Sequence, residues 1–119
     1  MAQSTEILPN GLQLLQDDRF FKLGQDSVLL SAFAKPRRNA KLLDLGCGTG
    51  TLALLVWRPD LKITGLELQD GPLDLFRQSI AANELENVTA LQGDLRQMRT
   101  LLPHGSMDYV ICNRSEERV

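Results

Sequence analysis

The run Leu43-Asp44-Leu45-Gly46-Cys47-Gly48-Thr49-Gly50 joins one short apolar segment, residues 41–45, to another at residues 52–57. The first segment predicts a β-strand, and the second, which is closed by Pro59, predicts a helix buried on most sides. Glycines between a strand and a helix allow a tight turn and let a ligand approach bare backbone N–H groups. The run therefore predicts an α/β fold with a ligand-binding loop.

Strands and helices alternate along the rest of the chain. The strands expected from the apolar pattern are 41–45, 61–66, 88–91 and 107–112, and the helices are 52–57, 70–83 and 95–102. Asp70 is expected to cap the second helix, with Pro72 in its first turn. This alternation is typical of a parallel sheet with right-handed crossovers, whose ligands bind beyond the carboxyl ends of the strands.

The chain before residue 36 predicts a separate N-terminal block, residues 1–35. Segments 12–16 and 20–23 flank the turn-like 17–19 and predict a β-hairpin, and a helix is expected after residue 27. A polar seam at 35–39 separates this block from the strand–helix unit at 40–113. We expect both parts to belong to one domain, residues 1–119.

Composition narrows the class of protein. The 119 residues are 43% hydrophobic and 24% charged, with a net charge of −2, so no bulk field favours an anionic polymer. The two cysteines, Cys47 and Cys112, lie far apart without a metal-binding spacing, which argues against a disulfide framework and a metal site. No apolar run is long enough to cross a bilayer. We therefore expect a cytoplasmic protein with no membrane partner.

Acidic residues follow the second and third expected strands. Glu67 lies 21 positions beyond Gly46, where a carboxylate can accept both hydroxyls of a ribose. Asp94, in Gly93-Asp94-Leu95, is placed to accept from an adenine amine, and the Leu95 N–H to donate to the ring. The alternative is that either acid is only a loop carboxylate or a helix cap. Thr51, where a dinucleotide fingerprint has its third glycine, disfavours a dinucleotide.

At these residues the chain resembles the class I S-adenosylmethionine-dependent methyltransferases. Residues 43–50 match their first motif, Glu67 their ribose acid and residues 93–95 their adenine-side motif. The resemblance implies a Rossmann-like fold with strand order 3-2-1-4, and S-adenosylmethionine or S-adenosylhomocysteine as ligand. It also implies that Asp44 orients the loop or the methionine amine. The candidate cofactor-binding residues are Gln25, Asp26, Asp44, Gly46, Cys47, Gly48, Gly50, Glu67, Leu68, Asp94, Leu95 and Asn113.

The N-terminal block resembles one particular group within these methyltransferases. Residues 10–16, Phe20 and residues 24–30 are similar to bacterial tRNA(Val) adenine-N6 methyltransferases. In that family the block caps the cofactor, so the resemblance makes Gln25 and Asp26 secondary candidates for contact with the methionine end. Alternatively, Asp26 only caps the helix that follows it. The resemblance implies methyl transfer to adenine N6 of tRNA.

The family's Asn-Pro-Pro-Tyr motif is only partly present. Asn113 follows the fourth strand, but Arg114-Ser115-Glu116 stand where the family has Pro-Pro-Tyr. Asn113 is the candidate catalytic residue, because a side-chain acceptor must hold the weakly nucleophilic amine. Without the stacking tyrosine, we expect cofactor binding with catalysis incomplete.

Two alternative functions remain open from the sequence. A protein-glutamine N5 methyltransferase uses the same motif, and a binding or scaffold domain would keep only the cofactor pocket. By resemblance the fold is half complete, so the fourth strand would form an exposed edge, through which we expect self-association.

Overall fold

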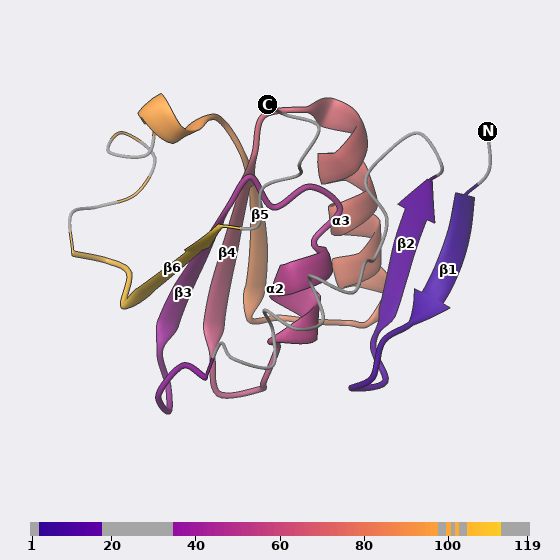
Figure 1. Cartoon of the computed structure of the whole chain (residues 1–119), viewed down its shortest axis with the longest axis horizontal. Helices are drawn as coiled ribbons and strands as arrows, with labels where there is room; N and C mark the ends of the chain where they lie inside the picture. Colours follow the sequence, from indigo (N-terminus) through magenta and orange to yellow (C-terminus); the bar gives the residue numbers. More distant parts are fainter. Residues whose placement is uncertain (1–2, 18–34, 98–99, 101, 103–104, 113–119) are drawn as a thin grey trace.

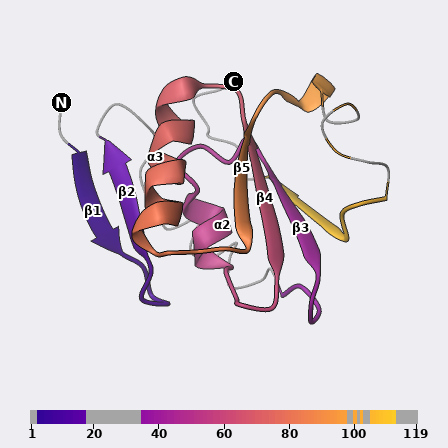
Figure 2. The ribbon, with the colours of Figure 1, turned by 180° about the vertical axis from the view of Figure 1, so that it is seen from behind.

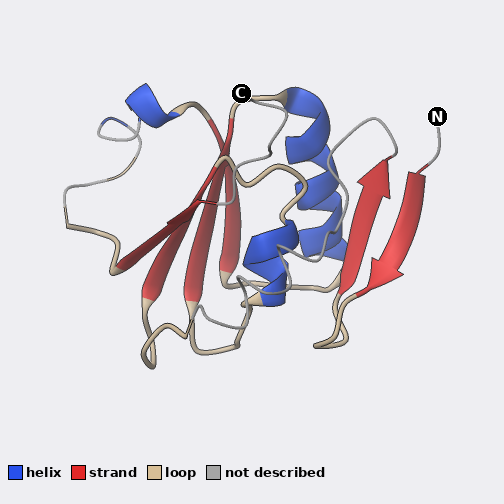
Figure 3. Ribbon diagram, in the orientation of Figure 1, coloured by secondary structure: helices blue, strands red, loops and turns tan. Residues whose placement is uncertain are grey.

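The computed structural model describes residues 3–17, 35–97, 100, 102 and 105–112. Helices lie between a four-stranded sheet and a separate two-stranded hairpin (Figures 1 and 3). The elements are β1 (Gln3–Ile7), β2 (Gln13–Asp17), β3 (Lys41–Leu45), α2 (Thr51–Leu55), β4 (Lys62–Glu67), α3 (Asp70–Ala82), β5 (Val88–Gln92), the 3₁₀ turn η1 (Leu95–Gln97) and β6 (Tyr109–Cys112).

The larger sheet is parallel, with strand order β5-β4-β3-β6. This is the order 3-2-1-4 expected from the sequence, so the Rossmann-like fold is confirmed. Alternate strand residues, such as Leu42, Ile63 and Val88, belong to the buried core that α2 and α3 cover. Figure 2 shows the same arrangement from behind, with both helices on one side of the sheet and η1 on the other.

The helices begin close to the expected positions, with two differences. Helix α2 ends at Leu55 rather than at residue 57. The chain leaves the helix at Val56 and continues toward Pro59. Helix α3 has Gln69 as its N-cap, in an extended conformation, and Asp70 is its first helical residue. The expectation that Asp70 caps α3 is therefore wrong. Its carboxylate instead accepts a hydrogen bond from the Gln92 side chain on β5.

An N-terminal hairpin is present, but the sequence placed its strands wrongly. The segment expected as the first strand is the second, β2, and it pairs with the upstream β1. The turn is formed by Pro9, Asn10 and Gly11, where Gly11 has φ +89°. Asn10 donates from Nδ2 to the Leu54 carbonyl at 2.8 Å, which ties the turn to the end of α2. The polar, exposed β1 shows no apolar alternation, so its pattern carried no strand signal.

Several expectations fall outside the described residues. These are the strand at 20–23, the helix after 27, Gln25, Asp26 and Asn113. The helix expected at 95–102 is described only in part, and its first three residues form the 3₁₀ turn η1 instead of an α-helix. In the part of the chain that is described, no helix is both long and apolar enough to cross a bilayer.

Candidate functional site

The carboxyl ends of β3, β4 and β5 are joined into one edge by backbone hydrogen bonds. The Cys47 N–H, after β3, donates to the Leu66 carbonyl at 3.1 Å. The Gly93 N–H, after β5, donates to the Glu67 carbonyl at 3.0 Å. The three connections that hold the candidate residues therefore lie side by side, where an open parallel sheet binds its ligands.

The glycine loop has two positions that face open space. Gly46 and Gly48 have φ values of +63° and +59°, a conformation that disfavours other residues. Apart from its neighbours in the chain, no atom of the described residues lies within 4 Å of a Cβ atom built on either glycine. Steric packing within the protein therefore does not explain these glycines, and the loop backbone is open to a ligand.

Two other glycines have the opposite surroundings. A Cβ atom on Gly50 would lie 2.1 Å from Phe76 Cδ1, and one on Gly65 would lie 2.5 Å from Phe76 Cε2. The ring of Phe76, from α3, thus fills the space between the loop and β4. Gly50 was expected as a cofactor contact, and its visible role is to admit this ring. Sequence reasoning missed Gly65 and Phe76, although a glycine inside a strand signals a close approach.

Glu67 fixes the glycine loop to the end of β4. Its side chain is buried, Oε1 accepts from the Gly48 N–H at 2.8 Å, and Oε2 accepts from the Gln69 N–H at 3.0 Å. A carboxylate offers about four acceptor positions, so each oxygen can accept one further hydrogen bond. Glu67 can therefore hold the loop and still accept hydrogen bonds from two hydroxyl groups.

Asp44 lies fully buried at the end of β3, and neither of its carboxylate oxygens has a hydrogen-bond partner of normal geometry within the described chain. Burial raises the pKa of Asp44 to about 8, the charge of Glu67 adds to the rise, and the Ala53 backbone amide partly offsets it. The carboxyl is therefore neutral at pH 7 in the free protein. A cationic ligand group beside it would favour ionisation.

Cys47 is a buried free thiol in the same loop. Burial, followed by the negative charges of Asp44 and Glu67, raises the pKa of Cys47 well above its usual value. A thiol that stays protonated is a poor nucleophile. The structure therefore assigns Cys47 a packing position beside Gly65.

Asp94 has the local contacts of a helix cap. Its Oδ1 accepts from the N–H groups of Arg96 and Gln97 at 2.9 and 3.2 Å, and its Oδ2 pairs with the Arg96 guanidinium at 2.9 Å. The hydrogen bond from the Arg96 side chain lowers the pKa of Asp94. The capping alternative is thus present in the structure, and the contact with an adenine amine stays a prediction.

Leu68 is the exposed apolar residue at this edge, with 57% of its surface accessible. It follows Glu67 directly, and its carbonyl accepts a hydrogen bond from Gln92 Nε2 at 3.2 Å. An apolar side chain held open beside a buried carboxylate can cover one face of a planar ring. Leu95 lies at the start of η1 on the neighbouring connection.

The structure therefore brings most of the candidate residues to one edge. Those placed there are Asp44, Gly46, Cys47, Gly48, Gly50, Glu67, Leu68, Asp94 and the backbone of Leu95. Gln25, Asp26 and Asn113 lie outside the described residues. In the described part of the chain, no three His, Cys, Asp or Glu side chains are grouped as metal ligands.

Two solved structures share the fold of this chain over most of its length. A 16S rRNA methyltransferase of T. thermophilus, in complex with AdoMet and guanosine, superposes with a TM-score of 0.76 at 20% identity. The match covers 96% of this chain and 33% of that one. TYW2 of M. jannaschii, in complex with AdoMet, gives 0.74 at 18% identity over 91% and 49% of the two chains. At these identities the likeness shows the fold.

Sequence relatives and a family model give the remaining comparison. The tRNA1(Val) (adenine(37)-N6)-methyltransferase of Pseudoalteromonas translucida is 34% identical over 94 residues, 77% of this chain and 39% of that protein. The enzyme of the same name in Yersinia pestis is 29% identical over 96 residues, 77% and 38% of the two. The chain spans about two fifths of the length of these relatives. The model of the methyltransferase domain matches residues 42–117, so the chain belongs to the methyltransferase domain family.

Proposed function

We propose that this chain binds S-adenosylmethionine at the carboxyl edge of its sheet and serves a transfer of methyl to N6 of adenine in tRNA. One observation carries the proposal. Glu67, a buried carboxylate, holds the glycine loop while Gly46 and Gly48 keep their outer surface open. The positive φ values account for glycine at these two positions, and the open space beside their backbone N–H groups leaves room for a ligand at the carboxyl edge of the sheet.

Each part of the cofactor has a counterpart at this edge. The open backbone of Gly46 and Gly48 suits the methionine tail, and Asp44 lies beneath it to balance the ammonium group. Glu67 keeps two acceptor positions for the ribose hydroxyls. Asp94 and Leu68, at the ends of β5 and β4, suit the adenine amine and ring face. When bound, S-adenosylmethionine supplies an electrophilic methyl group.

The target amine must be aimed at that methyl group by the protein. The lone pair of an exocyclic adenine amine is delocalised into the ring, so an acceptor that holds its N–H groups raises its reactivity. Asn113, the residue that follows β6, is our candidate for this role. In such a transfer the amine nitrogen would bond to the methyl carbon as the sulfur–methyl bond breaks, S-adenosylhomocysteine would be left, and the nitrogen would release one proton to solvent.

The identity of the substrate rests on the relatives. Two proteins named as tRNA1(Val) adenine-N6 methyltransferases align with 77% of this chain, including part of the N-terminal block. We infer tRNA as the substrate class and a cytoplasmic location on this basis, and the free, buried Cys47 fits a reducing compartment.

A methyl-transfer assay tests the proposal. The chain is incubated with methyl-labelled S-adenosylmethionine and tRNA transcript, and the tRNA is digested to nucleosides. Because Arg114-Ser115-Glu116 stand where the family has Pro-Pro-Tyr, we expect only a low level of label in N6-methyladenosine from wild type, and still less from Glu67→Gln. Glu6→Gln, at a partly exposed glutamate on β1 outside this edge, is the matched control. Label in a release-factor protein would favour glutamine N5 transfer, and binding without transfer would favour a non-catalytic domain.

We also propose self-association through β6. This strand ends the described sheet, and Val110 on it is 56% exposed. An exposed strand edge is a template for pairing with another chain. Sedimentation equilibrium should show an average mass that rises with concentration, and a constant monomer mass would refute this.

A further inference from the structure

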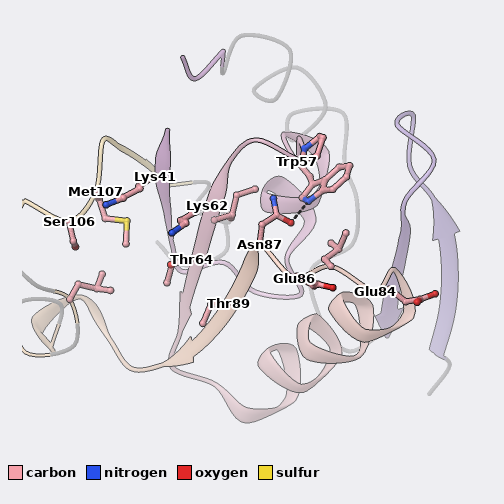
Figure 4. Close-up of a pocket in the computed structure, with 14 residues that line it drawn as sticks. Lys41, Trp57, Lys62, Thr64, Glu84, Glu86, Asn87, Thr89, Ser106 and Met107 are labelled. Atoms are coloured by element: carbon pink, nitrogen blue, oxygen red, sulfur yellow. Dashed lines mark hydrogen bonds between the residues drawn. The ribbon is translucent and has the colours of Figure 1, made fainter. Parts of the chain in front are cut away.

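A groove of about 760 Å³ lies at the amino ends of β3, β4 and β5, at the opposite end of the sheet from the glycine loop. Figure 4 shows Lys41, Lys62, Ser106 and Met107 gathered at one end, and Glu84 and Glu86 at the other. The cofactor edge uses none of these residues. The groove is therefore a second surface feature, separate from the proposed cofactor site.

The lysine end of the groove carries an excess of positive charge. Lys41 and Lys62 open β3 and β4 and are partners in register. Lys35 and Arg38, in the loop before β3, are exposed as well. Across the described chain, no carboxylate forms an ion pair with any of these four side chains.

Two acidic groups of this region, Asp60 and Asp108, already form ion pairs with arginines, and the charge of Asp108 also interacts with that of Lys41. Asp108 forms an ion pair with Arg37 at 2.9 Å, and Asp60 forms one with Arg58 at 2.9 Å. Lys35, Arg38, Lys41 and Lys62 therefore form a local concentration of positive charge in a chain whose net charge is −2. Local patches of positive charge bind the negatively charged phosphate backbone of RNA.

Hydroxyl donors line the groove beside the lysines. Thr64 and Thr89 are register partners on β4 and β5, and both line the groove. The Ser106 Oγ is buried and has no hydrogen-bond partner among the described residues. Ammonium groups and hydroxyls are the donors that proteins use for phosphate oxygens.

The positions of the cations favour a ligand with several phosphate groups over a single phosphate. Lys35 and Arg38 extend the positive charge along the chain beyond the groove, whereas a single phosphate group would need only Lys41 and Lys62. Glu84 and Glu86 repel phosphate from the far end. We propose that Lys35, Arg38, Lys41 and Lys62 form a docking surface for the phosphate backbone of an RNA substrate, an inference that rests on the proposed function.

The position of this surface suits an orienting role. A strand of five residues spans about 17 Å, a distance that a folded RNA can bridge. Contacts to phosphate fix the register of a nucleic acid and carry no sequence information. The surface would hold the RNA body while the target base enters at the cofactor edge.

The test compares two variants that remove the same net charge. Lys41→Gln with Lys62→Gln removes two positive charges from the surface, and Arg77→Glu makes the same change on α3. Binding of an unmodified tRNA transcript is measured by fluorescence anisotropy between 50 and 200 mM salt. Losing two phosphate contacts should weaken binding roughly 30-fold at about 0.1 M salt and reduce the salt slope by about 1.4 to 1.8. Arg77→Glu should bind as wild type does.

Two further readouts separate the outcomes. Binding of S-adenosylhomocysteine should be unchanged in the double lysine variant, which shows that the cofactor edge is intact. If wild type binds RNA through the lysines but binds no cofactor, the proposed function fails and the docking surface stands. Wild-type RNA affinity and salt slope in the lysine variant would overturn the inference. So would specific competition by inorganic phosphate at constant ionic strength, because that marks a single-anion site.

Discussion

Four glycines near the end of the sheet fall into two pairs with different steric surroundings. One pair is Gly46 and Gly48, and the other is Gly50 and Gly65. The first pair borders empty space, and the second pair borders the ring of Phe76 at distances that exclude a Cβ atom. Three of the four lie in a single loop of five residues. The comparison shows that the loop has an inner half that packs the domain and an outer half that is free to contact a ligand.

The largest expected effect is on the inner half. Gly50→Ala places a methyl group 2.1 Å from Phe76 Cδ1 at φ +89°. Overpacking and the left-handed backbone together should cost about 2 to 5 kcal/mol of unfolding free energy. Urea unfolding followed by circular dichroism measures it. Phe76→Ala in the same chain should relieve part of the clash, so the two losses should sum to more than the loss in the double variant.

The raised pKa of Asp44 predicts a pH dependence of the unfolding free energy. Its pKa is raised from 3.8 to about 8 in the folded state, so the folded protein binds a proton that the unfolded chain releases between these values. The stability contributed by this group is complete below pH 3.8 and is lost as pH rises toward 8. Between pH 5 and 7 the unfolding free energy should fall by about 3 kcal/mol, since one proton linked to folding changes it by about 1.4 kcal/mol per pH unit.

Asp44→Asn is the matching variant, because it keeps the shape and cannot ionise. Its stability should change less over the same pH interval than that of wild type. An equal slope in the two proteins would show that Asp44 is not the group that titrates.

The outer half is tested by Gly48→Ala, with Gly11→Ala as its control. Both glycines have positive φ and open space around a Cβ atom, but Gly11 lies in the hairpin turn. Each change should cost about 1 to 2 kcal/mol of stability. Isothermal titration should show at least a 10-fold loss of S-adenosylhomocysteine affinity in Gly48→Ala alone. Equal affinities in the two variants would remove the distinction between the two halves.

The smallest effect is expected at Asp94, where capping and ligand contact must be separated. Serine caps a helix about as well as aspartate, so Asp94→Ser should leave the melting temperature nearly unchanged. If the carboxylate also contacts the adenine amine, the affinity for S-adenosylhomocysteine should drop a few-fold. Unchanged affinity would leave Asp94 with its capping role only.

The sequence was sufficient for the parallel sheet. Each of its strands is a short apolar run bounded by turn residues, and the strand order was implied by the family resemblance. The hairpin was misplaced because Gln3–Ile7 is polar and exposed, and because segment 12–16 can pair on either side. The Asn10-Gly11 pair was the available signal.

The sequence predicted where the site lies. It did not predict which glycines of the loop pack against Phe76 and which face open space. Glycine spacing identifies a loop, yet the neighbour that fills one half, Phe76, lies 26 positions beyond Gly50 in the sequence. Only the fold brings that ring beneath the loop. Likewise, the pattern around Asp94 suits a cap and a ligand equally, because both use the same carboxylate oxygens.

The most direct test of the account is an NMR titration of the labelled protein with S-adenosylhomocysteine. Saturable shifts should appear at the backbone amides of Gly46, Gly48, Leu68 and Asp94, while those of Lys41 and Lys62 at the other end of the sheet stay in place. Absence of saturable shifts in a folded sample, or shifts centred on the lysine end, would contradict the claim that the open half of the glycine loop binds the cofactor.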